Sequence, residues 1–150
     1  MKKSCMFGAL LLMLLPIALV VWWFGSWGEV EAISPAPLSY RQLSESAQDD
    51  VPPFAGNIYL ADYAHWQVGE WARRFDIPPG SEAALREWVN TKGGQAVDVA
   101  QYCHLSEMTA PDWWAKPADA RLVSNRRLES RRMSIWFSPS QHRVWILYKQ

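Results

Sequence analysis

The side chains that could perform chemistry in this 150-residue chain are few and scattered. Four Cys or His residues beyond position 60 stand in no CxxC or HExxH arrangement: His65, Cys103, His104 and His142. A metal centre needs three or four ligands that converge on one point, and this spacing predicts none. Cys103 could pair with a histidine as a nucleophile, because such pairs assemble in space, but no nucleophile elbow accompanies it. We therefore predict no catalytic residue, no metal and no cofactor, with an enzyme that uses a Cys103/His centre as the alternative.

The charged residues are balanced overall but separated along the chain. Fifteen Lys and Arg residues offset fifteen Asp and Glu residues, so the formal net charge is zero at pH 7. Residues 116–150 hold eight bases and two acids, whereas residues 41–112 hold five bases and eleven acids. A neutral chain gives no reason to expect nucleic acid as a partner, because phosphate binding usually shows as a basic excess.

Five arginines gather within twelve positions of the basic tail: Arg121, Arg126, Arg127, Arg131 and Arg132. The planar guanidinium suits carboxylates and phosphates, and it also stacks on aromatic rings. This arginine cluster predicts a docking surface for anionic lipid headgroups or for an acidic protein face. The simpler alternative is ion pairing within the domain, which contributes little for each exposed pair.

Tryptophan is the other unusual residue type, with ten in the chain. Trp113 and Trp114 are adjacent in a loop bounded by Pro111 and Pro117. An exposed aromatic pair is typical of a recognition surface, whereas buried tryptophans fill a core. Both interpretations of Trp113 and Trp114 stay open from the sequence.

The domain that positions these side chains follows an apolar N-terminal segment. The run from Met6 to Trp27 has no charged residue and would span about 33 Å as a helix, which matches a bilayer core of roughly 30 Å. It predicts a transmembrane signal anchor. Three tryptophans at its far end are placed where indole rings settle at the headgroup level: Trp22, Trp23 and Trp27.

The flanking charges predict the orientation of this leader. Lys2 and Lys3 precede the apolar run and acidic residues follow it, so the positive-inside rule places the N-terminus in the cytoplasm and the rest outside. The alternative is a signal peptide cleaved near Ala32, because small residues stand at the positions that a signal peptidase inspects. The product would then be periplasmic or secreted.

The remaining chain divides by composition into a linker and a domain. Residues 1–28 form the cytoplasmic stub and anchor, residues 29–53 are rich in Pro and Ser and predict a flexible linker, and residues 54–150 form an extracytoplasmic domain. In that domain Ser81 can begin a helix that runs to about Lys92. Five segments are strand-like: residues 57–60, 65–77, 121–125, 133–137 and 143–149.

The predicted fold is therefore α+β, with an N-terminal transmembrane helix, an antiparallel sheet of four or five strands and one packed helix. In the last strand, alternation places Val144, Ile146 and Tyr148 on one face and Trp145 and Leu147 on the other. Both faces of this strand are apolar. We expect this hairpin to be covered on both sides or to abut a partner.

Several short motifs of residues 52–150 resemble a group of small, uncharacterised bacterial envelope proteins and lipoproteins: Pro53 to Ile58, Arg74 to Pro78, and Pro111-Asp112-Trp113-Trp114. The resemblance implies an extracytoplasmic α+β module, and this chain departs from the lipoproteins in lacking a lipobox. We predict a single-pass inner-membrane protein with a periplasmic binding or structural module, whose partners are the lipid bilayer and an envelope protein or anionic headgroups. The alternatives are an envelope enzyme and an immunity or accessory protein of an envelope assembly.

Overall fold

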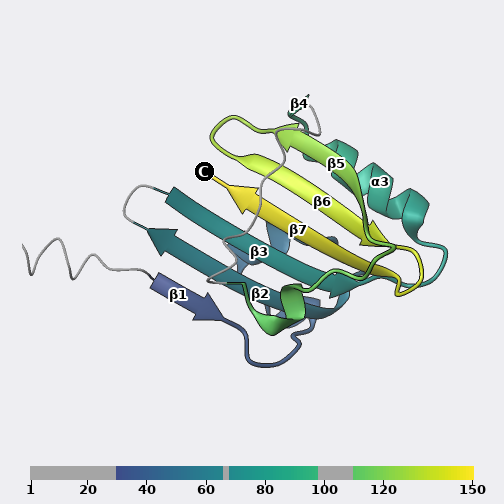
Figure 1. Cartoon of the computed structure of the whole chain (residues 1–150), viewed down its shortest axis with the longest axis horizontal. Coiled ribbons are helices and arrows are strands. Elements are labelled where there is room, and N and C mark those ends of the chain that lie inside the picture. Colours follow the sequence, from purple (N-terminus) through teal and green to yellow (C-terminus); the bar gives the residue numbers. More distant parts are fainter. Residues whose placement is uncertain (1–29, 66–67, 98–109) are drawn as a thin grey trace, which may run out of the picture.

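The computed structural model describes residues 30–65, 68–97 and 110–150, which form one antiparallel sheet of seven strands (Figure 1). Across the sheet the strand order is β1-β2-β3-β7-β6-β5-β4. The strands are β1 (Val30–Ile33), β2 (Gly56–His65), β3 (Val68–Asp76), β4 (Gln95–Ala96), β5 (Arg121–Arg127), β6 (Arg132–Ser138) and β7 (Arg143–Lys149).

The expected sheet of four or five strands was therefore wrong. The two additional strands are β1 and β4, which have four and two residues and form the two edges of the sheet. Strands this short carry too little alternation to be recognised in a sequence. The five strand-like segments of the sequence correspond to β2, β3, β5, β6 and β7.

The helices of the described residues are few and short. They are α2 (Glu45–Asp49), α3 (Glu82–Thr91) and two 3-10 turns, η1 (Tyr40–Gln42) and η3 (Asp112–Trp114). Helix α3 follows Ser81 as expected, although the Ser81 side chain makes no capping hydrogen bond. After α3 the chain turns at Gly93 and Gly94, whose φ angles of 65° and 81° lie in the left-handed region that glycine tolerates.

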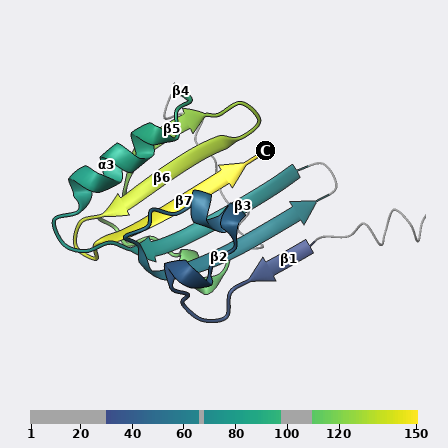
Figure 2. The same ribbon diagram turned by 180° about the vertical axis from the view of Figure 1, so that it is seen from behind.

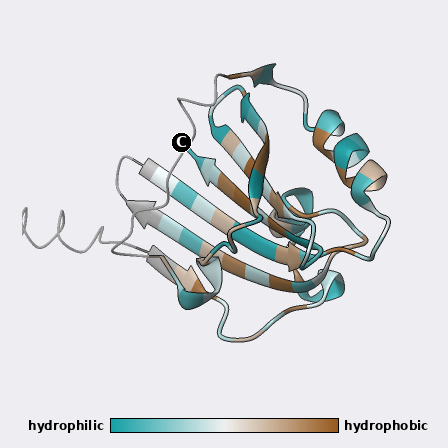
Figure 3. Cartoon of the chain, turned by 45° about the vertical axis from the view of Figure 1, so that its right-hand side comes forward, coloured by the Kyte–Doolittle hydropathy of each residue, from teal (hydrophilic) through white to brown (hydrophobic). Residues whose placement is uncertain are grey.

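Strand β7 lies in the interior of the sheet and is buried on both faces. Val144, Trp145, Ile146, Leu147 and Tyr148 all have 0% exposure. Alternation directs three of these side chains into one core and the other two into a second core. This confirms that the terminal hairpin is covered on both sides, and Figure 3 shows the hydrophobic stretch of the strand that ends at the C-terminus.

Two layers cover the two faces of the sheet. Seen from behind (Figure 2), α3 and the segment that carries α2 lie on the same face, where they enclose the larger core with Phe75, Ile135 and Ile146. On the opposite face, the segment around η3 packs over a smaller core that includes Trp136 and Trp145. A sheet covered on both faces needs apolar residues at consecutive strand positions, and β6 and β7 have them.

The segment that composition predicts as a linker contributes to the fold from residue 30 onward. It supplies β1, η1 and α2, and it buries Leu43, Ala47 and Val51 in the larger core. Leu38 also pairs with Ile58 through a β-bridge. The folded body thus begins well before Phe54.

The expected membrane segment, with Trp22, Trp23 and Trp27, lies outside the described residues. The N-terminal transmembrane helix of the predicted fold is accordingly not part of the architecture described above. Within residues 30–65, 68–97 and 110–150, no helix is long and apolar enough to cross a bilayer.

Candidate interaction site

A groove of about 600 Å³ separates helix α3 from strand β5. Leu85 and Val89 of α3 line it from one wall, with only 3% and 6% of their surface exposed. Leu122 and Val123 of β5 line the other wall. Val123 is 46% exposed. Leu85 and Val89 are thus buried at the base of the groove, and Val123 is its exposed apolar side chain.

The outer edge of β5 forms one wall of this groove. Its neighbour β4 pairs with Arg126 and Arg127 at the far end of the strand, and the Val97 N–H just after β4 donates to the Asn125 carbonyl at 3.0 Å. Between Leu122 and Ser124 the pairing with β6 shifts register, which marks a β-bulge beside Val123. Within the described residues no strand pairs with the outer edge of β5 from Arg121 to Ser124. Such an edge presents backbone donors and acceptors to an incoming chain.

Arginines surround the groove. Arg86 of α3 and Arg121 and Arg126 of β5 line it, opposed by one acid, Glu82. Arg126 ties β5 to the end of α3, because its guanidinium donates to Asn90 Oδ1 at 2.8 Å and to the Gly93 carbonyl at 3.0 Å. The formal charge of the lining is thus +2, and the Arg126 end is closed by this bridge.

The five arginines of the predicted cluster do not form one surface. Arg121 and Arg126 line the α3–β5 groove, whereas Arg127, Arg131 and Arg132 line a hollow of about 340 Å³ at the β5–β6 turn. Lys149 and Glu129 complete the charged lining of this turn hollow. Part of its positive charge is neutralised inside the domain, since Lys149 Nζ lies 2.6 Å from Glu70 Oε1.

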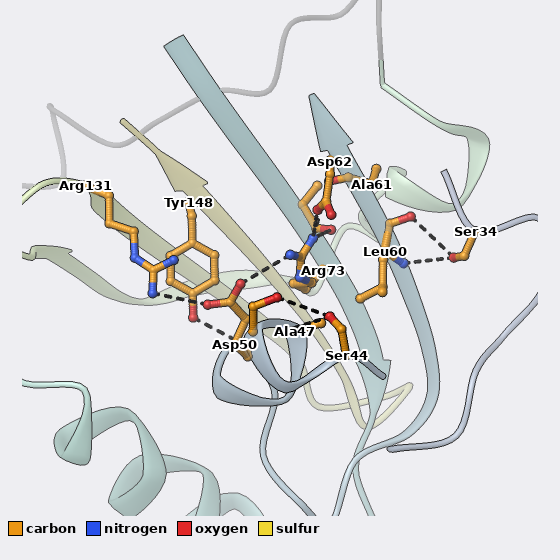
Figure 4. A network of polar contacts seen from close by, with 12 residues as sticks. Ser34, Ser44, Ala47, Asp50, Leu60, Ala61, Asp62, Arg73, Arg131 and Tyr148 are labelled. Carbon is orange, nitrogen blue, oxygen red and sulfur yellow. Dashed lines mark hydrogen bonds and ion pairs between the residues drawn. The ribbon is translucent and has the colours of Figure 1, made fainter. Parts of the chain in front are cut away.

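Arg131 belongs to a buried charge network that faces the larger core (Figure 4). The Asp50 carboxylate lies between two guanidinium groups, with Arg73 Nη2 at 3.2 Å and Arg131 Nη2 at 3.2 Å. Arg73 also pairs with Asp62 and donates to the Ala72 carbonyl at 3.1 Å. The Arg131 guanidinium stacks 4.3 Å from the Tyr148 ring centroid. This network ties the end of α2 to strands β3 and β7 and is therefore structural.

Burial dominates the electrostatics of this network. Desolvation raises the pKa of Asp50 above its ordinary value, although Arg73 and Arg131 act in the opposite direction. Burial likewise raises the pKa of the Tyr148 hydroxyl, with the Asp50 charge as a second cause. The Tyr148 hydroxyl donates to the Asp50 main-chain carbonyl at 3.5 Å. Of the network, Arg131 also lines the hollow at the β5–β6 turn.

Trp113 and Trp114 pack on the smaller core. Trp114 is 7% exposed and meets Trp136 edge to face, with ring centroids 6.1 Å apart. Trp113 is half-buried and lies 5.7 Å from the Tyr59 ring. The Lys116 ammonium lies over the Trp114 ring at 4.5 Å, and desolvation lowers its pKa. The structure thus places the tryptophan pair as a cover over the sheet.

The remaining chemical candidates are placed as follows. Cys103 and His104 lie outside the described residues, and the side chain of His65 is also outside them. His142 occupies the β6–β7 turn with Nδ1 at 3.9 Å from Glu82 Oε1. Among the described residues, no three His, Cys, Asp or Glu side chains are grouped as metal ligands.

No protein family, curated protein or solved structure was found to match the chain. The resemblance to small envelope proteins accordingly stays a prediction from the sequence. Fold and site define an antiparallel sheet covered on both faces, with a groove between helix α3 and strand β5 next to the short edge strand β4. Sequence reasoning missed the groove walls Leu85, Val89 and Val123, and the available signal in β5 was the adjacent apolar pair Leu122 and Val123.

Proposed function

We propose that this protein is a membrane-associated periplasmic interaction module that captures an extended segment of a partner protein in the α3–β5 groove. The segment would lie along the outer edge of β5 as an additional strand. The observation that carries the proposal is the coincidence of the groove and its exposed Val123 with a stretch of β5 edge, Arg121 to Ser124, that no described strand pairs. Main-chain hydrogen bonds supply affinity in this binding mode, and pockets for alternate side chains supply specificity.

The dimensions of the two walls agree with this role. Helix α3 has ten residues, which makes it about 15 Å long. The open path from Arg121 to Ser124 along β5 covers about 10 Å at the rise of an antiparallel strand. The groove therefore accommodates about four residues of extended chain beside the helix.

Selection from a library of random peptides tests the proposal. Full-length protein in mild detergent is the target, and the Val123→Asp variant is the counter-target. Both should fold, because Val123 is 46% exposed. Removing an apolar anchor from the centre of a small interface should weaken enriched peptides about tenfold. Hydrogen exchange at residues 121–124 should slow when a peptide binds.

The matched control is Ile33→Asp on the opposite edge strand. Ile33 is 37% exposed and large, like Val123, but it lies on β1 at the other side of the sheet. Peptides should bind this variant as they bind the wild type. Peptides that tolerate Val123→Asp, or that lose affinity with Ile33→Asp instead, would show that the groove is not the docking site.

A further inference from the structure

The charges around the α3–β5 groove indicate which kind of segment it takes. Arg86 and Arg121 stand on opposite walls, and both side chains are exposed. Within residues 30–65, 68–97 and 110–150, neither guanidinium has an acid within ion-pair distance. Glu82, one turn before Arg86 on α3, is directed to His142 Nδ1 at 3.9 Å.

The two ends of the groove along β5 differ from each other. Arg126 spans from β5 to Asn90 and Gly93 and closes the end near the C-terminus of α3. The opposite end is lined by Arg121 and Pro139. An extended chain therefore meets Arg121 as it enters and Arg86 beside the apolar floor.

We infer that the partner segment is acidic and extended, with carboxylates at alternate positions toward Arg86 and Arg121 and an apolar residue that packs beside Val123. This inference rests on the proposed function, because it specifies the chemistry of the segment that the groove captures. Carboxylates at alternate positions of a strand lie about 7 Å apart on one face. Arginine binds carboxylates through paired N–H donors, and the formal charge of +2 on the lining is complementary to such a segment.

Three short synthetic peptides test this inference by fluorescence anisotropy on the full-length protein. The first alternates Glu and Val, the second replaces each Glu with Gln, and the third replaces each Glu with Lys. Two exposed ion pairs should make the Glu peptide bind about threefold to tenfold more tightly than the Gln peptide. The advantage should shrink at about 0.5 M salt, where exposed charges are screened.

A variant with Arg86→Gln and Arg121→Gln should bind the Glu and Gln peptides equally. Both side chains are exposed, so the fold should survive, and Arg126 is retained because it holds the end of α3. If all three peptides bind the wild type equally and all lose affinity for the Val123→Asp variant, the acidic preference is overturned and the proposed function stands. Binding that is indifferent to Val123→Asp would overturn both.

Anionic lipid is the competing ligand of the same chemistry class. Vesicles of phosphatidylglycerol and phosphatidylcholine should not compete with the Glu peptide for the wild-type protein. Competition that disappears in the double arginine variant would assign these arginines to lipid headgroups and overturn the peptide inference.

Discussion

The buried pair between Arg73 and Asp50 allows a quantitative test of how the N-terminal segment is held on the sheet. The substitution Arg73→Met removes the guanidinium but keeps an unbranched side chain of similar reach. It leaves the Asp50 carboxylate, whose side chain is 6% exposed, with Arg131 as its remaining ion-pair partner. It also removes donors to two main-chain carbonyls.

The expected cost follows from the burial of both partners. Removing one member of a buried ion pair usually destabilises a protein by 3–5 kcal/mol. Arg131 is still 3.2 Å from Asp50 and is 34% exposed, so a value of about 3 kcal/mol is expected at neutral pH. With the m value of a small protein, this corresponds to a fall of about 1–3 M in the urea midpoint.

The cost should depend on pH in a defined direction. Burial raises the folded-state pKa of Asp50 above the ordinary value of 3.8. Asp50 therefore binds its proton more tightly in the folded protein than in the unfolded chain. Its contribution to stability is present below the unfolded pKa and is lost as the pH rises through the folded one. Arg73 lowers this pKa, and its removal raises it further. The destabilisation by Arg73→Met should therefore be smaller near pH 4 than at pH 7.

Urea unfolding of the full-length protein, followed by tryptophan fluorescence at both pH values, measures this difference. The control is Asp62→Asn, which removes the other acidic partner of Arg73. Asp62 is 41% exposed, so its loss should cost at most about 1 kcal/mol. Equal costs for Arg73→Met at the two pH values, or a cost for Asp62→Asn as large as that for Arg73→Met, would refute the assignment of Asp50 as the buried partner.

Four further substitutions test the packing and the turns. Gly94→Ala should cost about 2–4 kcal/mol of stability, because φ is positive at this position and an added Cβ would lie 2.8 Å from a carbonyl oxygen. Gly80 also has a positive φ, but open space surrounds it. Gly80→Ala should therefore cost about 1 kcal/mol in thermal melts. Trp114→Ala should lower the free energy of unfolding by about 3–5 kcal/mol in urea titrations. The Ser140 N–H lowers the pKa of Asp119, so the stability that Asp119 contributes is lost on acidification, and Asp119→Asn should flatten the decline of Tm at low pH.

The central strands could be predicted from the sequence because their signal is local. Strands β6 and β7 combine apolar, β-branched and aromatic residues over seven positions each. Segment 30–53 was misleading because its prolines and serines outnumber the residues that it buries. Leu43, Ala47 and Val51 are spaced at four residues, and this short apolar stripe was the available evidence that the segment folds onto the sheet.

The groove and the charge network could not be predicted because they join residues far apart in the chain. Asp50 and Arg73 are separated by 23 positions, and no spacing rule connects them. The alternation of β3 nevertheless contained a hint, since Arg73 shares a face with Trp71 and Phe75. An arginine on the core face of a strand requires a buried acidic partner, and the acidic residues of the preceding segment were the candidates.

The arrangement of the sheet itself restricts where a partner can bind. Covering layers occupy both faces, so main-chain hydrogen-bonding groups are offered only along the edges of the sheet. The edge strands are β1 and β4, and β1 lines neither of the two hollows described above. Because β4 has only two residues, no described strand pairs with β5 from Arg121 to Ser124, where it faces α3 across the groove. Extending β4 by designed strand residues toward Arg121 should therefore close the groove and abolish peptide binding while raising stability, and unchanged peptide affinity in that variant would place the docking site elsewhere.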